Sequence, residues 1–304
     1  MENGKSSYIS MFRSGEMEKK IEALKGSLRS CDICPRKCHI DRISGETGFC
    51  RIGRKARVAS FGPHFGEEKP LVGRSGSGTI FFSGCNLACQ YCQNWDISQK
   101  DTGNDVDAEE LAGIMMKLQG MGCHNINLVS PSHVVFQFLE ALEIACMRGL
   151  EIPIVYNTGG YDSVETLKLL DGVVDVYMPD MKYSDPNVGK RLSLVEDYPI
   201  VNRDAVREMH RQVGDLEMDE RGVAVKGLLV RHLVLPGGMA GTGEISRFLS
   251  EEISKDTYIN IMAQYRPQYK SCEYPQIDRK PNRDELMGSF QVAKEHGLWR
   301  FDSF

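Results

Sequence analysis

Three cysteines in one short loop have the residue type and the spacing that bind an inorganic cluster. Cys85, Cys89 and Cys92 form a CxxxCxxC pattern within the string GCNLACQYC. Thiolates at this spacing can bind three of the four irons of a [4Fe–4S] cluster. The next cysteine is Cys123, so one iron keeps a free position for a small molecule. A zinc site completed by Cys123 or His124 is the alternative, but both residues begin the next expected strand, away from the loop.

A second set of cysteines lies nearer the N-terminus. Cys31, Cys34, Cys38 and Cys50 place four thiols within twenty residues, enough to close a zinc site or to bind a complete iron–sulfur cluster. The spacing does not separate these interpretations, and we favour iron–sulfur because a cell that loads the first cluster can load a second. Disulfides are disfavoured in a reducing compartment. The other three of the ten cysteines receive no predicted role: Cys123, Cys146 and Cys272.

Composition and charge argue against several classes of protein. The 304-residue chain has a formal net charge of −5 and is 41% hydrophobic and 26% charged. These values are ordinary for a globular domain and argue against a nucleic-acid-binding surface. One of the longest apolar stretches, 228–235, is interrupted by Arg231 and His232 and is far shorter than a membrane span. The N-terminus lacks the apolar core of a secretory signal, so we expect a cytoplasmic protein with reduced thiols.

Strands and helices are expected to alternate from residue 79 onward. Short apolar runs predict strands, and amphipathic repeats with capping residues predict helices. The expected strands are 79–83, 124–130, 152–157, 173–179, 227–235 and 258–263. The expected helices are 107–121, 134–148, 163–170, 201–212, 243–253 and 283–296, with a hairpin around 215–222. Six such units predict an α/β fold with a parallel sheet. Because a closed barrel has about eight units, we expect an open partial (β/α)6 barrel with its site at the carboxyl ends of the strands.

We divide the chain into three parts. Residues 1–30 are expected to form a loose polar arm over 1–15 and a helix over 17–28. Residues 31–78 form a cysteine-rich metal-binding extension followed by a connector with short strands at best, and residues 79–304 form the barrel.

Charged side chains in the connector and in one strand have simple interpretations. His64, Glu67 and Glu68 form a charged cluster that we interpret as solvated surface. Arg231 and His232 interrupt an apolar strand. Because burying both without partners would be costly, we expect at least one of them to line a cavity.

The position of the first cysteine loop carries a resemblance to a known family. A CxxxCxxC motif with an aromatic residue before its last cysteine, directly after the first strand of a six-unit βα chain, resembles the radical SAM superfamily. The longer string GTIFFSGCNLACQYCQN is similar to its pyruvate formate-lyase activating enzymes. The segments that resemble the PflX-type homologues are CDICPRKC at 31–38, GETGFC at 45–50, HNINLV at 124–129 and GLLVRHLVLP at 227–236. The resemblance runs from about residue 30 to the C-terminus.

This resemblance implies an oxidoreductase that works through a radical. A [4Fe–4S] cluster on Cys85, Cys89 and Cys92 would bind the amino and carboxylate groups of S-adenosylmethionine (SAM) through its free iron. One electron would then cleave the sulfonium bond and give methionine and a 5′-deoxyadenosyl radical, which abstracts hydrogen from a substrate. The cofactor carries the hard chemistry, whereas the protein orients it and excludes water.

The resemblance also places SAM contacts at the carboxyl ends of the later strands. The residues at these positions are Ser130, Asn157, Thr158, Asp180, Lys182, Arg231 and Gln264. Activating enzymes carry Gly-Gly-Glu after the second strand, where this chain has SPSH at 130–133, so the methionine amino group must find other acceptors. Each of these residues could instead cap a helix or form a turn. Asp180 and Lys182 could form a surface ion pair worth under about 1 kcal/mol.

The leading hypothesis for the function has two alternatives. The leading hypothesis is an enzyme that installs a glycyl radical on a partner enzyme. Its electrons would come from a low-potential donor of the flavodoxin or ferredoxin kind. The second hypothesis keeps SAM cleavage but modifies a different peptide or a small molecule. The third is a non-catalytic electron carrier or metal-binding protein, and the missing fourth cysteine of the first loop counts against it. The sequence defines no substrate and identifies no catalytic residue.

Overall fold

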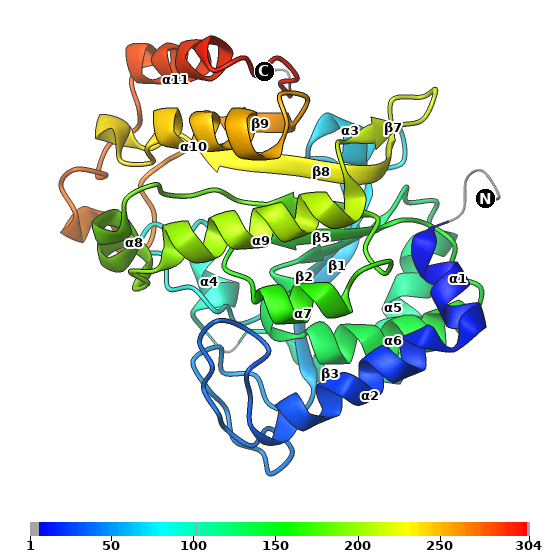
Figure 1. The fold of residues 1–304 in the computed structure, drawn as a ribbon. Coiled ribbons are helices and arrows are strands. Elements are labelled where there is room, and N and C mark those ends of the chain that lie inside the picture. The colour runs from blue at the N-terminus through cyan, green and yellow to red at the C-terminus, as the bar shows by residue number, and fades with distance from the viewer. Residues whose placement is uncertain (1–5, 101, 303–304) are drawn as a thin grey trace.

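A parallel sheet forms the centre of the structure, a computed structural model that describes residues 6–100 and 102–302. Within these residues, six strands run parallel in the spatial order β2, β4, β5, β6, β8 and β9. Their bounds are Ser77–Phe82, Ile126–Val129, Ile154–Thr158, Val176–Pro179, Ala224–Leu233 and Tyr258–Met262. In this part of the chain β2 and β9 do not pair with each other, so the barrel is open (Figure 1). The predicted partial (β/α)6 barrel is confirmed.

Helices follow the strands and cover the outer face of the sheet (Figure 1). They are α5 (Ala108–Gly120), α6 (Val135–Met147), α7 (Val164–Leu169), α8 (Pro186–Ser193), α9 (Tyr198–Val213), α10 (Thr242–Phe248) and α11 (Arg283–Glu295). A capping box begins α5 as predicted, because the Asp107 carboxylate accepts from the Glu110 N–H and the Glu110 carboxylate accepts from the Asp107 N–H. Shorter helical segments are α4 (Trp95–Ser98), η1 (Pro131–His133), η2 (Pro236–Gly238), η3 (Leu249–Ile253) and η4 (Ser271–Glu273). The sequence does not predict α8.

The connector before the barrel contains more regular structure than the sequence predicts. β1 (Ala56–His64) has nine residues and pairs antiparallel with β2, and β3 (Asn104–Val106) extends β1 on its other side. The expectation of short strands at best is therefore wrong. β1 covers the outer edge of β2, whose backbone groups would otherwise be unpaired. At the other end of the sheet, β7 (Glu217–Met218) pairs antiparallel with β8 and confirms the predicted hairpin.

The two faces of the central sheet bury different sets of apolar side chains. Tyr156 and Tyr177 belong to the large core beneath the helices, whereas their neighbours Val155 and Val176 belong to a separate inner cluster. Successive residues of a strand point to opposite faces, so the inner cluster fills the inside of the barrel. Leu71, from the short helix α3 that spans 69–72, is part of this cluster. The connector thus closes the amino-terminal end of the barrel and leaves the carboxyl end for polar residues.

The N-terminal segment is packed onto the barrel. The expected loose arm over 1–15 falls partly outside the described residues, but Ser7–Ser14 forms helix α1. Tyr8 is fully buried, and its hydroxyl donates to the Ile152 carbonyl at 2.9 Å. The Ser7 N–H and hydroxyl both donate to the Asp175 carboxylate. These tertiary contacts, which the polar sequence does not reveal, correct the expectation of a loose arm.

Helix α2 (Glu16–Arg29) confirms the helix predicted over 17–28. Gly15, with a φ of 74°, makes the left-handed turn between α1 and α2. The buried face of α2 packs against α6 (Figure 1). Within the described residues, no helix combines the length and the apolar content needed to cross a membrane.

Candidate active site

A pocket opens at the carboxyl ends of the parallel strands, the edge at which the sequence places the site. The loop after β2 contributes the three cysteines, and the ends of β4, β5, β6 and β8 contribute polar and charged side chains. Six of the seven residues predicted to contact SAM line this pocket beside the cysteines: Ser130, Asn157, Thr158, Asp180, Lys182 and Arg231. Segments far apart in the sequence therefore meet around one space.

Gln264, the seventh predicted contact, does not line this pocket. Strand β9 ends at Met262, and the Gln264 side chain is exposed. Its backbone carbonyl accepts a hydrogen bond from the Gln93 side chain at 3.4 Å, which places it near the rim. Gln264 lies two residues beyond the end of β9 and outside the pocket lining, and its role as a SAM contact stays a prediction.

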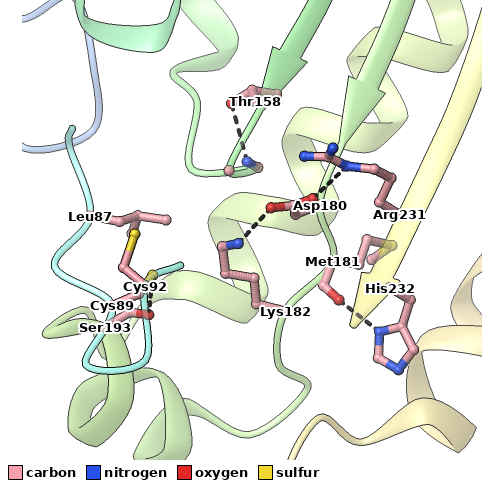
Figure 2. Close-up of polar contacts among 12 residues, drawn as sticks. Leu87, Cys89, Cys92, Thr158, Asp180, Met181, Lys182, Ser193, Arg231 and His232 are labelled. Atoms are coloured by element: carbon pink, nitrogen blue, oxygen red, sulfur yellow. Dashed lines mark hydrogen bonds and ion pairs between the residues drawn. The ribbon is translucent and has the colours of Figure 1, made fainter. Parts of the chain in front are cut away.

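Each thiol of the first cysteine loop has a polar partner. The contacts are the Leu87 N–H to Cys85 Sγ (3.3 Å), the Ser193 hydroxyl to Cys89 Sγ (3.0 Å) and Ser98 Oγ to Cys92 Sγ (3.2 Å). Figure 2 shows the contact between Ser193 and Cys89. Donors to a ligating sulfur stabilise its negative charge. Burial raises the pKa of Cys85 to about 12, so this thiol needs a metal or a nearby cation to ionise.

Asp180 lies at the centre of a buried charged network beside these thiols. Its Oδ2 lies 2.5 Å from Lys182 Nζ, and its Oδ1 lies 2.9 Å from Arg231 Nε (Figure 2). Arg231 Nη2 also donates to Asn157 Oδ1 at 2.8 Å. Burial opposes the charge of Asp180, but the cations of Arg231 and Lys182 outweigh it and hold its pKa below the usual value. The sequence allowed a surface ion pair here, whereas the structure places the pair in the pocket lining, where two cations face the Asp180 carboxylate.

Arg231 and His232 face opposite sides of strand β8. Arg231 lines the pocket, as the sequence predicts for at least one of the two. His232 Nδ1 lies 2.7 Å from the Met181 carbonyl oxygen (Figure 2), and its Nε2 lies 2.9 Å from Thr242 Oγ1. Burial lowers the pKa of His232, so this side chain is a neutral packing residue outside the pocket.

Glu68 in the connector is buried, contrary to the prediction of a solvated cluster. It is 5% exposed, and its Oε1 accepts from the Asn260 amide at 3.0 Å. Burial raises the pKa of Glu68, and the charge of Arg231 partly opposes that rise. His64 Nδ1 lies 2.8 Å from Glu67 Oε1. The connector thus adds an acidic group behind the pocket network.

Two supporting groups were not predicted from the sequence. The Asp162 carboxylate is buried and accepts from the hydroxyls of Thr158 at 2.6 Å and Tyr156 at 3.1 Å. Ser132 Oγ lies 2.9 Å from Thr158 Oγ1, so these groups together fix the Thr158 side chain. A polar residue after a strand is the only signal that could have indicated Asp162.

Tyr198 is the second supporting residue. Its hydroxyl accepts from the Lys182 N–H at 3.1 Å and lies within 3.0 Å of the Asp180 carbonyl oxygen. It therefore holds the backbone that carries both charged side chains. The sequence offers no local signal for this contact, because Tyr198 lies before the residue at which the helix was expected to begin.

The family comparison covers the segment that carries the cysteine loop. Residues 79–223 match the family model of the radical SAM superfamily. This span contains most of β2 and all of β4, β5 and β6, and it ends just before β8. This segment of the chain is therefore similar to the radical SAM superfamily.

Two uncharacterised proteins of Methanocaldococcus jannaschii are similar to this chain over most of its length. The protein MJ0674 is 34% identical over 290 residues, which cover 93% of this chain and 79% of MJ0674. The protein MJ0808 is 24% identical over 275 residues, which cover 84% of this chain and 75% of MJ0808.

Solved structures of radical SAM proteins are among those similar to this fold. A radical SAM methyltransferase from Sphaerobacter thermophilus aligns at 17% identity and a TM-score of 0.49, over 73% of this chain and 66% of its own. The hydrogenase maturase HydG from Carboxydothermus hydrogenoformans aligns at 13% identity and a TM-score of 0.48, over 71% and 49%. SuiB of Streptococcus suis, bound to its precursor peptide SuiA, aligns at 14% identity and a TM-score of 0.48, over 72% and 46%. Each of these proteins extends well beyond the shared region.

The donor set of the first loop fits a [4Fe–4S] cluster, the group that this superfamily implies. In residues 6–100 and 102–302, no three His, Cys, Asp or Glu side chains are placed to hold a single metal ion. A four-iron cluster makes a different demand, because each cysteine binds a separate iron. The three thiols line one pocket, and Lys182 acts electrostatically on Cys85 and Cys89. Cys85, Cys89 and Cys92 are therefore the residues that would hold the cluster.

Proposed function

We propose that this chain cleaves SAM reductively at the Cys85–Cys92 loop and uses the resulting radical to abstract hydrogen from a substrate. The observation that carries the proposal is that three thiols and the Asp180–Lys182–Arg231 network line one pocket. When bound, the cluster supplies the electron that breaks the sulfonium carbon–sulfur bond of SAM. The protein's own residues bind and orient SAM and shield the pocket from water.

Lys182 and Arg231 are the proposed binding groups for the methionine carboxylate. A lysine ammonium has three donors and a guanidinium has five, and the contacts with Asp180 and Asn157 use only part of them. Because Lys182 and Arg231 both line the pocket and keep donors that Asp180 does not use, they suit an anionic ligand.

Apolar side chains in the pocket wall are proposed to protect the radical. Phe82, Leu87 and Leu233 line the pocket together with the polar groups. Apolar walls exclude water from the space where a reactive species forms. A substrate must therefore approach through the mouth of the pocket, beside the exposed Gln93 and Asn94.

SAM binding to the iron-loaded protein tests the site directly. The protein is reconstituted anaerobically with iron and sulfide, reduced, and examined by electron paramagnetic resonance before and after SAM is added. We expect SAM to change the cluster signal in the wild type and in Cys272→Ala, whose cysteine is exposed and lies outside the pocket lining. Cys85→Ala should lose the change that SAM causes in the signal. A fully loaded wild type whose signal ignores SAM contradicts the proposal.

The finer proposal is that the substrate is a glycyl radical enzyme and that a flavodoxin- or ferredoxin-like protein supplies the electron. Its support is the similarity of the cysteine-loop string to pyruvate formate-lyase activating enzymes, together with a mouth suited to a peptide segment. Trp95, next in sequence to the pocket residue Asn94, stacks on Tyr269 with ring centroids 5.5 Å apart, and Lys100 Nζ lies 4.3 Å from the Trp95 ring centroid. Stacked aromatic rings with a nearby cation are typical of surfaces that bind peptides.

Pyruvate formate-lyase is the probe for the finer proposal. We expect a glycyl-radical doublet when it is incubated anaerobically with the loaded, reduced protein and SAM. The Cys85→Ala variant provides the blank. SAM cleavage without any glycyl radical would reject this substrate while leaving the radical SAM activity in place.

A further inference from the structure

We propose that Cys31, Cys34, Cys38 and Cys50 bind a second iron–sulfur cluster and that the buried guanidinium of Arg42 is its counter-charge. This site lies in the N-terminal extension, outside the pocket that carries the proposed function. The inference therefore does not depend on SAM cleavage.

The backbone of the extension is shaped around its cysteines. Lys37, His39 and Arg51 adopt left-handed φ values of 42°, 52° and 62°, and each is next to a cysteine of the set. Such conformations are strained for residues with side chains and persist where the surroundings fix them. A Cβ atom at Gly48 would lie 2.9 Å from Cys38 Sγ, so only glycine lets the chain pass this close to the thiol. These features hold the thiols in set positions.

Arg42 is the observation that points to a negatively charged group here. Its side chain is 1% exposed, and within the described residues it pairs with no carboxylate. Its Nη1 donates to the His133 carbonyl at 2.8 Å, its Nη2 lies 3.5 Å from Cys50 Sγ, and its Nε has no partner in the described part of the chain. A buried guanidinium without a counter-ion is costly. Because Arg42 also acts electrostatically on Cys34, thiolates are the anions within its reach.

The arrangement favours a cluster over a single ion. Cys50 interacts electrostatically with Cys31 and Cys38, and Cys34 interacts with Cys31 and Cys50, so the four thiols share one region. Yet no three cysteines of the described residues converge enough to hold a single metal ion. Thiols that surround a common region without converging match a cluster, in which each binds a separate iron. Four thiolates also give the cluster a negative charge, and this charge would balance the buried guanidinium of Arg42.

The extension is in direct contact with the first cysteine loop. Arg51, next to Cys50, donates to the Ser98 carbonyl at 2.8 Å, and Ser98 Oγ lies 3.2 Å from Cys92 Sγ. A Cβ atom at Gly84, the residue before the loop, would lie 2.3 Å from the Cys50 carbonyl oxygen. Figure 1 shows the loop that follows α2 beside the segment with α4. A second cluster would therefore make the extension more rigid where it contacts the first cysteine loop.

Iron and sulfide analysis of variants tests the proposal. The triple variant Cys85→Ala, Cys89→Ala, Cys92→Ala should retain about four of roughly eight irons per chain after anaerobic reconstitution. Adding Cys34→Ser should remove the remaining iron, whereas adding Cys272→Ser should not. A triple variant without iron, or with one bound zinc in its place, overturns the proposal. The triple variant keeps all four N-terminal cysteines. Its iron content therefore tests the proposal even if the variant with the added Cys34→Ser does not fold.

The role of Arg42 is tested by the rate at which a chelator removes iron from the triple variant. We expect Arg42→Met to lose its iron at least tenfold faster and Arg42→Lys to stay within a few-fold of its parent, because lysine keeps the charge. Arg54→Met is the matched control, since Arg54 lies in the same segment but pairs with Glu140 at the surface. Equal rates in Arg42→Met and its parent overturn the role of Arg42.

Failure of this proposal is distinguishable from failure of the proposed function. A wild-type protein with about eight irons that forms no 5′-deoxyadenosine would reject SAM cleavage and keep the second cluster. A protein with about four irons that cleaves SAM would do the reverse.

Discussion

Arg231 Nε lies 2.9 Å from Asp180 Oδ1, and the Met181 N–H donates to the Arg231 carbonyl at 2.8 Å. Strands β6 and β8 are therefore joined twice at their carboxyl ends, once through the backbone and once through a buried ion pair. The ion pair also faces the pocket beside the cysteines. The residues proposed to bind SAM thus also hold neighbouring strands together, which couples ligand binding to the stability of the barrel.

The Asp180–Arg231 pair is expected to make a measurable contribution to stability. Arg231→Met should lower the free energy of unfolding by roughly 3 kcal/mol, because it leaves a buried carboxylate with one cation fewer. Arg231→Lys should lower the free energy of unfolding by less than Arg231→Met does. Urea unfolding provides the measurement, and Arg247→Met, which breaks only the exposed pair with Glu244, is the control. A loss in Arg231→Met no larger than in the control would contradict the assigned role of the pair.

Lys182 is expected to govern the affinity for SAM. Lys182→Met should raise the Kd of the iron-loaded protein for SAM at least tenfold, or about 1.4 kcal/mol, because the carboxylate loses a buried cation. Anaerobic titration calorimetry measures the change. Lys190→Met removes an exposed lysine that pairs with Glu196 and should leave the Kd unchanged. An unaltered Kd in Lys182→Met would place the carboxylate elsewhere.

Ser193 is expected to tune the first cluster through Cys89. The Ser193 hydroxyl donates to Cys89 Sγ at 3.0 Å and lies 2.8 Å from the Tyr183 hydroxyl. A donor to a ligating thiolate stabilises the more negative, reduced cluster. Ser193→Ala should therefore lower the reduction potential by some tens of millivolts, as measured by potentiometric titration. Ser250→Ala is the control, because the Ser250 hydroxyl donates to the Arg247 carbonyl, far from the cysteines in sequence, and equal potentials in the two variants would reject the role of Ser193.

His133 is expected to make the fold sensitive to acid. Burial lowers the pKa of His133 to about 4, below the value of about 6.5 in an unfolded chain. Its Nε2 lies 2.9 Å from the Ser83 carbonyl oxygen, and within the described residues its Nδ1 has no partner, so the neutral ring is the folded form. The unfolded state binds the proton first, and stability falls as the pH drops from 6.5 towards 4.

Protonation of His133 is expected to lower the free energy of unfolding by about 2 kcal/mol between pH 6.5 and pH 5. Urea unfolding at both pH values measures it, and the loss should shrink in His133→Gln. His296→Gln, at the end of α11, should retain the wild-type loss. If His133→Gln loses as much stability as the wild type, another group is responsible for the acid sensitivity.

The elements that the sequence predicts well are those with local signals. The CxxxCxxC spacing of the first loop and the capping box of Asp107 and Glu110 need only a few neighbouring residues. The alternation of short apolar runs and amphipathic repeats was enough to predict six parallel strands. Because polar residues directly after such strands reach the same edge of the sheet, most of the predicted pocket residues followed.

The parts that the sequence does not reveal depend on contacts between distant segments. Glu68 was interpreted as solvated, but its partner Asn260 lies 192 residues away. Ser193 lies on α8, a helix of only eight residues whose buried face carries just Val188 and Leu192 as large apolar side chains, and its partner Cys89 lies 104 residues away. Arg42 looks like a surface residue in a polar loop until the fold buries it beside Cys50. In each case the determining partner is set by the fold and leaves no local pattern.

Formation of 5′-deoxyadenosine tests the central claim most directly. The iron-loaded wild type, reduced anaerobically with SAM, should form 5′-deoxyadenosine and methionine in equal amounts. Cys89→Ala should form neither, and Cys272→Ala should match the wild type. A reduced wild type with a full complement of iron that leaves SAM intact would contradict the account.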